Sequence, residues 1–247
     1  DLAVIGIEDD YCRAIATTLC TRSTPCLTLS GAPTTPAANL YGQNGALWRN
    51  GQKLAPLGQA LPGSHNAENA AAAFAMAEFL GVPQTAIAAG RASFAGLPHR
   101  QKVVAEQNGI VFVDDSKATN ADAASRALGC YPKLVWIAGG IAKEGGIASL
   151  VPYFARITYT LLIGQDAAQL AQTLAAHNAP YTVVETLDRA VPAAYALAQS
   201  TGAPVVLLSP ACSSFDQFSG FEARGLRFQE LALGLGTPQA AQTGKSG

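Results

Sequence analysis

The sequence predicts an α/β fold with a mostly parallel sheet, and two observations support this. Short apolar runs of strand length alternate with longer stretches in which apolar residues recur at helical spacing. The alternation is clearest beyond residue 100, where it implies right-handed crossovers that place helices on both faces of the sheet. We therefore expect a Rossmann-like sheet in the second half of the chain.

The composition indicates a folded protein and argues against a general nucleic-acid binder. Of the 247 residues 49% are hydrophobic and 13% are charged, which suffices for one large core or two modest ones. The net charge of -1 lacks the basic excess that nucleic-acid binding requires. No apolar run approaches the roughly 18 to 20 residues of a membrane span. The 5 cysteines form no C-x-x-C pair, so we expect reduced thiols in a cytoplasmic protein.

The first part of the chain combines α/β alternation with a hairpin region. Acidic residues follow the first apolar run, where they favour a helix N-terminus, and Asn-Gly pairs at 44–45 and 50–51 are typical of hairpin turns. The predicted elements are a strand at 3–7, a helix through 12–19, short strands between 26 and 62, and helices at 65–80 and 84–92.

A domain boundary is expected between residues 96 and 97, where a Gly- and Pro-containing segment precedes a fresh alternation of strands and helices. This divides the chain into domains 1–96 and 97–235, followed by a polar tail at 236–247 that we expect to be disordered. Beyond the boundary we predict a hairpin of 103–107 and 110–113, strands at 134–138, 160–163, 182–184 and 205–208, and helices at 122–128, 147–154, 166–176, 187–198 and 216–233.

Unusual residues follow three of the predicted strands. The segments are DDSKATN at 114–120, GGIAKEGG at 139–146 and SPACSSFD at 209–216. Ligands of an open parallel sheet bind outside the carboxyl ends of its strands, so these three loops should form one site.

Each residue also has a simpler interpretation. Asp115 or Ser116 could cap the next helix, and the pair Gly139-Gly140 alone is more often a turn than a phosphate loop. Lys143 alone would usually be a solvated surface lysine. Cys212 has no recognisable histidine partner, so a packed small hydrophobe is favoured over a nucleophile.

Several motifs taken together are more specific than any one of them. They are GSHNAEN at 63–69, LPHR at 97–100, DDSKATN at 114–120, GGxxK at 139–143, and LLSPACSSFDQF at 207–218 with FExRG at 221–225. In this order they resemble the Mur ligase family from residue 1 to about 235, and in particular its D-glutamate-adding members. The last motif is the most specific, since other members of the family end differently.

The resemblance implies an ATP-dependent carbon–nitrogen ligase of peptidoglycan precursor synthesis that adds D-glutamate to UDP-N-acetylmuramoyl-L-alanine through an acyl phosphate. Residues 1–96 would be the end of the central ATP-binding domain, and 97–235 the Rossmann-like C-terminal amino-acid-binding domain. The implied ligands are ATP, Mg²⁺ and the two small-molecule substrates. We expect a monomer without nucleic-acid or membrane partners.

The resemblance also implies roles for individual residues. Asn66 and Asn69 would face the adenine of ATP, Arg100 its phosphates, and Asp115 the ribose hydroxyls. The residues implied for D-glutamate are Lys117, Thr119, Lys143, Ser214, Phe215 and Phe221. No metal ligand and no certain catalytic residue is implied within this chain.

The family's phosphate loop, its Mg²⁺-binding residues, its carbamylated lysine and its UDP-binding domain would all lie upstream of Asp1. We therefore expect this chain alone to be catalytically incompetent. A non-catalytic nucleotide-binding regulatory module is the alternative, although an amino-acid pocket with Lys117, Lys143 and Ser214 argues against it. A nicotinamide-dependent dehydrogenase is weaker still, because no G-x-G-x-x-G follows any predicted strand.

Overall fold

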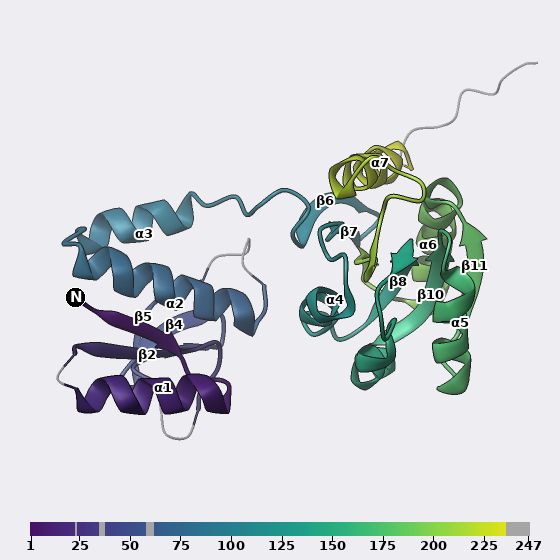
Figure 1. The fold of residues 1–247 in the computed structure, drawn as a ribbon. Coiled ribbons are helices and arrows are strands. Elements are labelled where there is room, and N and C mark those ends of the chain that lie inside the picture. The colour runs from purple at the N-terminus through teal and green to yellow at the C-terminus, as the bar shows by residue number, and fades with distance from the viewer. Residues whose placement is uncertain (23, 35–37, 58–61, 236–247) are drawn as a thin grey trace, which may run out of the picture. The chain divides into compact units, whose positions relative to one another are not determined.

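The computed structural model describes residues 1–22, 24–34, 38–57 and 62–235, which fall into two compact units (Figure 1). Unit 1 is Asp1–Gly96 and unit 2 is Leu97–Gly247, and each is described by itself. The predicted disorder of 236–247 lies outside the described residues. No helix in the described ranges has the length and apolarity needed to cross a bilayer.

Unit 1 contains a five-stranded mixed sheet. Its order is β1 (Ala3–Gly6), β2 (Cys26–Ser30), β3 (Leu40–Gln43), β4 (Ala46–Arg49) and β5 (Gln52–Pro56). The first three strands are parallel and the last three are antiparallel. Asn44, Gly45, Asn50 and Gly51 all have positive φ, as the hairpin turns of Asn-Gly pairs require, so the predicted hairpin region is confirmed.

Three helices complete unit 1, and all three were predicted to within a few residues. They are α1 (Asp10–Thr21), α2 (Ser64–Phe79) and α3 (Gln84–Ala92). Asp9 caps α1, because its Oδ1 accepts a hydrogen bond of 2.8 Å from the backbone N of Cys12. Helix α2 buries Ala71 and Phe74 against Leu40 and Leu47 of the sheet, which forms the main core of this unit.

Unit 2 contains the mostly parallel sheet that the sequence predicts. Its order is β11 (Tyr181–Glu185), β10 (Ile157–Ile163), β8 (Leu134–Gly139), β12 (Val205–Leu208), β7 (Ile110–Asp114) and β6 (Lys102–Gln107). All neighbouring strands are parallel except the hairpin of β6 and β7. Asn108 and Gly109 turn that hairpin with positive φ.

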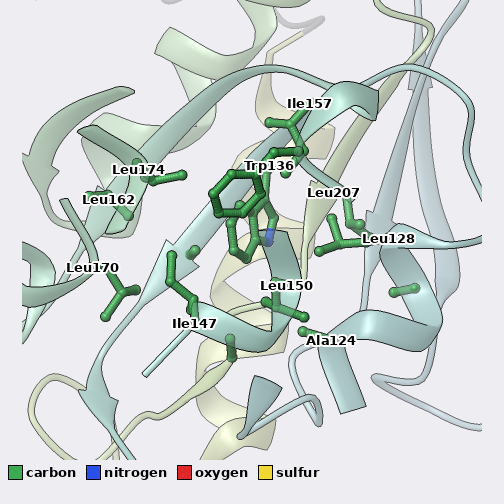
Figure 2. Close-up of a cluster of buried hydrophobic side chains, with 14 of the residues drawn as sticks. Ala124, Leu128, Trp136, Ile147, Leu150, Ile157, Leu162, Leu170, Leu174 and Leu207 are labelled. Atoms are coloured by element: carbon green, nitrogen blue, oxygen red, sulfur yellow. The ribbon is translucent and has the colours of Figure 1, made fainter. Parts of the chain in front are cut away.

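Helices cover both faces of this sheet. The elements are α4 (Ala121–Leu128), the 3-10 helix η1 (Ala148–Arg156), α5 (Ala167–Ala176), α6 (Leu187–Thr201) and α7 (Phe221–Gly234). Side chains of α4, η1 and α5 pack around Trp136 on one face, where leucine and isoleucine side chains surround the indole (Figure 2). Side chains of α6 and α7 pack around Phe112 and Phe228 on the other face. The sheet is therefore buried on both sides.

Two predicted helices differ from the structure. The helix expected at 147–154 is a 3-10 helix, which accommodates Pro152 without the N–H that an α-helix interior needs. The helix expected from residue 216 begins at Phe221 instead. Cys212–Ser213 form a short strand, β13, that pairs with β9 (Ile141–Ala142), and the carboxylate of Asp216 accepts from the distant backbone N of Gln165.

We predict that unit 2 resists proteolysis longer than unit 1. Its cores cover both faces of a sheet and enclose Trp136, Phe112 and Phe228 completely, whereas the clusters of unit 1 are smaller. Limited proteolysis followed by mass spectrometry should therefore leave a fragment that begins near Leu97. Preferential survival of residues 1–90 would contradict this prediction.

Candidate functional site

The structure brings the three unusual loops to one edge of the unit 2 sheet. Strand β12 lies between β7 and β8, and all three strands are parallel, so their carboxyl ends share that edge. Strands β9 and β13 pair antiparallel there, with Ala142 opposite Cys212 and Ile141 opposite Ser213. This pairing holds the loop that carries Lys143 beside the loop that carries Ser214.

The two glycines that end β8 permit this close approach. Gly139 and Gly140 have φ of 123° and 130°, a backbone conformation that L side chains rarely adopt. A Cβ at Gly139 would lie 1.9 Å from the carbonyl oxygen of Ile163, and one at Gly140 would lie 2.1 Å from that of Ser213. The pair therefore does more than turn the chain, because it lets three backbone segments pack directly together.

Two residues implied for D-glutamate are in contact although they are distant in the sequence. The Nζ atom of Lys117 lies 4.2 Å from the centre of the Phe221 ring, in a cation–π arrangement. The neighbouring Ser116 Oγ donates a 2.8 Å hydrogen bond to the Phe221 carbonyl oxygen. The start of α7 is thereby fixed against the loop after β7.

The other residues implied for D-glutamate differ in their exposure. Lys143 and Phe215 are exposed, Thr119 is half-buried and Ser214 is buried. Phe215 is 71% exposed, whereas Phe228, further along the same segment, is buried in the core of unit 2. An exposed aromatic ring and an exposed cation at this edge are available to a ligand.

Arg100 is exposed between two anchored neighbours. His99 Nδ1 lies 2.7 Å from Asp114 Oδ2, and the backbone N of Gln101 donates a 3.2 Å hydrogen bond to Asp115 Oδ1. His99 and Gln101 both have positive φ, which is unusual for residues other than glycine. Sequence reasoning did not identify His99 and Asp114 as site residues, although both lie within the quoted motifs.

Asp115 is almost fully buried beside Arg100. Its carboxylate also accepts a 2.7 Å hydrogen bond from Ser209 Oγ. Burial raises the pKa of Asp115 to about 7, although the hydrogen bond from Ser209 opposes this shift. The capping interpretation of Asp115 and Ser116 is wrong, because Asn120 caps α4 by accepting from the backbone N of Ala123.

Arg224 is a component of the site that sequence reasoning did not identify. It belongs to the FExRG motif, but only the fold shows that its side chain is 1% exposed. The guanidinium donates to Ser116 Oγ at 2.9 Å, to the Ser116 carbonyl at 2.8 Å and to the Cys212 carbonyl at 3.1 Å. Burial lowers the pKa of Arg224 to about 10, so the side chain remains a cation at neutral pH.

Cys212 is the packed small hydrophobe that the sequence predicts. Its side chain is fully buried among apolar residues of the unit 2 core. Burial raises the pKa of the thiol to about 12, which leaves almost no thiolate at neutral pH. Cys212 is therefore not a nucleophile in this environment.

The two asparagines implied for adenine lie in unit 1, on the first turns of α2. Asn66 Nδ2 donates a 2.7 Å hydrogen bond to the Pro62 carbonyl, while Asn69 is exposed. The N-cap of α2 is Gly63, which provides no side-chain cap, so neither asparagine occupies the capping position. Gly63 and Ser64 also line an open cavity of about 720 Å³ in this unit.

Comparison with known proteins identifies the family. A family model described as Mur ligase, glutamate ligase domain, matches residues 99–212. UDP-N-acetylmuramoylalanine–D-glutamate ligase of Caulobacter sp. (strain K31) is 42% identical over 97% of this chain and 52% of its own length. The chain belongs to the Mur ligase family. The ligase of the same name from Rhodospirillum rubrum is 52% identical over 73% of this chain and 38% of its own length.

Solved structures agree with the fold of a Mur ligase. MurC of Thermotoga maritima, a UDP-N-acetylmuramate-alanine ligase, matches 83% of this chain and 47% of its own chain with a TM-score of 0.59 and 17% identity. MurF of Acinetobacter baumannii matches 93% of this chain and 51% of its own with a TM-score of 0.57 and 18% identity. The chain spans about half the length of the curated relatives it matches.

We predict that Gly225→Ala destabilises unit 2 of this Mur ligase chain. A Cβ at Gly225 would lie 2.1 Å from His99 Nδ1 and 2.9 Å from Asp114 Oδ2, so the buried His99–Asp114 pair would have to move. Overpacking of this kind costs about 1 to 3 kcal/mol. In a Trp48→Phe background, urea unfolding followed by Trp136 fluorescence reports unit 2 alone.

The matched control for that prediction is Gly234→Ala. Gly234 belongs to the same helix, but a Cβ there would meet nothing within 4 Å. The control should unfold at the same or a slightly higher urea concentration, since alanine favours a helix by up to about 1 kcal/mol over glycine. Equal stability of the two variants would contradict the prediction, because it would show that a Cβ at Gly225 fits between α7 and His99 without cost.

We predict that Asp115 makes the stability of unit 2 depend on pH. Its native pKa of about 7 lies above the ordinary value of 3.8, so the native state retains a proton that the unfolded state releases. This contribution to the free energy of unfolding is complete below pH 3.8 and is lost as the pH rises through 7. Asp115→Asn should therefore be increasingly more stable than wild type between pH 4 and 7, by at most about 4 kcal/mol. Parallel stability curves of the two proteins would contradict the prediction.

Proposed function

We propose that this chain carries the amino-acid-binding part of an ATP-dependent ligase that joins D-glutamate to UDP-N-acetylmuramoyl-L-alanine. The observation that carries the proposal is the contact of Lys117 with Phe221 at an edge where two further loops converge. The names of the similar ligases, which are 42% and 46% identical to this chain, support the same substrates. The ligase activity as a whole is a proposal, because the chain spans only about half of those relatives.

The chemistry of the acceptor explains the residue types. D-glutamate has two carboxylates, and removing them from water is feasible only where cations and oriented donors replace the water. We assign carboxylate oxygens of D-glutamate to Lys143, with Lys117 and Thr119 nearby. Ser214, the backbone of Phe215, and the Phe221 side chain would close the pocket of its side-chain carboxylate. The amine would then be held in one orientation for attack.

The reaction that we propose has two steps. The γ-phosphoryl group of ATP passes to the L-alanyl carboxylate, which gives ADP and an acyl phosphate. The amine of D-glutamate attacks the acyl carbon and loses a proton, and the tetrahedral intermediate expels inorganic phosphate to leave the amide. Cations near the phosphoryl oxygens stabilise the charge that develops in both steps.

For ATP, we assign Asn66 and Asn69 of unit 1 to the adenine. In unit 2 we assign Arg100 to the phosphates and Asp115 to the ribose hydroxyls. Among the residues that the structure describes, no three His, Cys, Asp or Glu side chains group closely enough to hold a metal ion by themselves. We therefore assign no step of this chain to Mg²⁺. We place the reaction in the cytoplasm, where ATP and nucleotide-linked precursors are available.

The direct test uses the 247-residue chain, since every residue assigned to D-glutamate lies in unit 2. In ¹H–¹⁵N NMR titrations, D-glutamate should shift the backbone amides of the three loops more than L-glutamate does. A chain that binds ATP but neither enantiomer of glutamate would instead be a nucleotide-binding regulatory module. That result would overturn the proposed function.

We predict that Lys143→Ala weakens D-glutamate binding about ten- to a hundredfold. The substitution removes a charge-assisted contact worth roughly 1.5 to 3 kcal/mol, whereas ATP affinity should barely change. Ser214→Ala removes a neutral hydroxyl and should cost only about 1 kcal/mol.

Lys133→Ala is the control for both variants. This lysine precedes β8 at the opposite end of the strand, where its Nζ donates to the Thr201 carbonyl. Its substitution should leave the D-glutamate affinity unchanged. If Lys143→Ala behaves like this control, Lys143 is a solvated surface residue, and an equal loss toward ATP would place it on the phosphates.

A further inference from the structure

Arg224 is a buried cation whose guanidinium has backbone and hydroxyl partners rather than a carboxylate partner. Among the residues that the structure describes, no Asp or Glu oxygen lies within ion-pair distance of it. Three of its hydrogen bonds go to two segments, at Ser116 and Cys212, and a fourth acceptor in a third segment, the Gly139 carbonyl, lies 3.5 Å from Nη1. A buried charge is costly, so this arrangement needs an explanation beyond packing.

The guanidinium of Arg224 forms hydrogen bonds to all three loops at this edge of the sheet. Nε and Nη2 both bond to Ser116, the residue before Lys117, through its hydroxyl and its carbonyl. Nη1 faces the carbonyl of Cys212, two residues before Ser214, and the carbonyl of Gly139, which ends β8. Because the guanidinium is planar and its donors diverge at fixed angles, it sets the spacing between the loops after β7, β8 and β12.

Ser116 also links the guanidinium of Arg224 to Phe221, an aromatic residue of the proposed D-glutamate pocket. Its Oγ accepts from Arg224 Nε and donates to the Phe221 carbonyl at 2.8 Å. Phe221 begins the helix that also carries Arg224, and its ring lies against Lys117. The position of the Lys117 ammonium is therefore coupled to the guanidinium through one hydroxyl and one ring.

We infer that Arg224 is a positioning residue for D-glutamate, one that holds the loops of Lys117, Lys143 and Ser214 at the separation that the two carboxylates require. This inference rests on the proposed function and adds to it a residue that does not touch the substrate. A lysine at position 224 would keep the positive charge but would lack the planar set of donors that engages several acceptors at once. Arg224→Lys therefore separates the effect of geometry from that of charge.

The test measures D-glutamate affinity and thermal stability for the same variants of the 247-residue chain. Arg224→Lys should weaken D-glutamate binding at least about tenfold in the NMR titration, at a temperature where its spectrum shows a folded protein. Arg227→Lys is the control on the same helix, since Arg227 pairs at the surface with Asp188 and Glu230, and its affinity should stay within about twofold of wild type. The inference would be overturned if folded Arg224→Lys bound D-glutamate with the affinity of wild type, whether or not its Tm were lower.

If Arg224→Lys does not fold, Ser116→Ala tests the positioning role of Arg224 instead. It removes the hydroxyl between Nε and Phe221 and leaves the arginine in place, so we expect about three- to tenfold weaker D-glutamate binding, with altered amide shifts at Lys117 and Thr119. Unchanged binding by Ser116→Ala would overturn the inference. Failure of the wild-type chain to bind D-glutamate is a separate result, which rejects the proposed function itself.

Discussion

The pairing of β12 between β7 and β8 is the constraint on which the candidate site depends. Parallel pairing forces the three strands to end at one edge, and the loops that follow must share the limited space there. The loops satisfy their own backbone groups by the short β9–β13 ladder and by the buried guanidinium of Arg224. Gly139 and Gly140 are small enough to let the segments meet. The order of the strands in the sheet thus determines where the polar side chains of the three loops come together.

The charged residues at this edge of the sheet differ in how deeply they are buried. Asp114 and Asp115 lie inside, where Asp114 is engaged by His99 and Gln229, and Asp115 accepts from Ser209. The cations Arg100, Lys117 and Lys143 are exposed. Glu144 and Glu222 are exposed as well, so the exposed charges at this edge have both signs, whereas the two buried carboxylates have partners of their own. The three exposed cations are available to carboxylates and phosphates.

Local patterns were sufficient to predict most of this fold. The apolar runs of β8 and β12 and the Asn-Gly turn of β6 and β7 are signals confined to a few residues, and they predicted the correct elements. What the sequence did not predict depends on long-range contacts. Asp216 bonds to Gln165, 51 residues away, and so does not begin a helix, while the burial of Arg224 depends on Ser116, 108 residues away. For the candidate site, the convergence of the loops was predictable, whereas the His99–Asp114 pair was not, because a lone histidine gives no periodic signal.

The anchoring of His99 has a consequence for protein engineering. The contacts that organise the loops of the proposed acceptor site, from His99 to Arg224, are all internal to unit 2, so exchanging this unit between related proteins would transfer them together. The crossover point of such a chimera is restricted. His99 and Gln101 adopt left-handed conformations that are supported by Asp114 and Asp115, so a junction placed after them would separate a strained backbone from the carboxylates that hold it. A junction at or before Leu97 keeps both partners from the same parent.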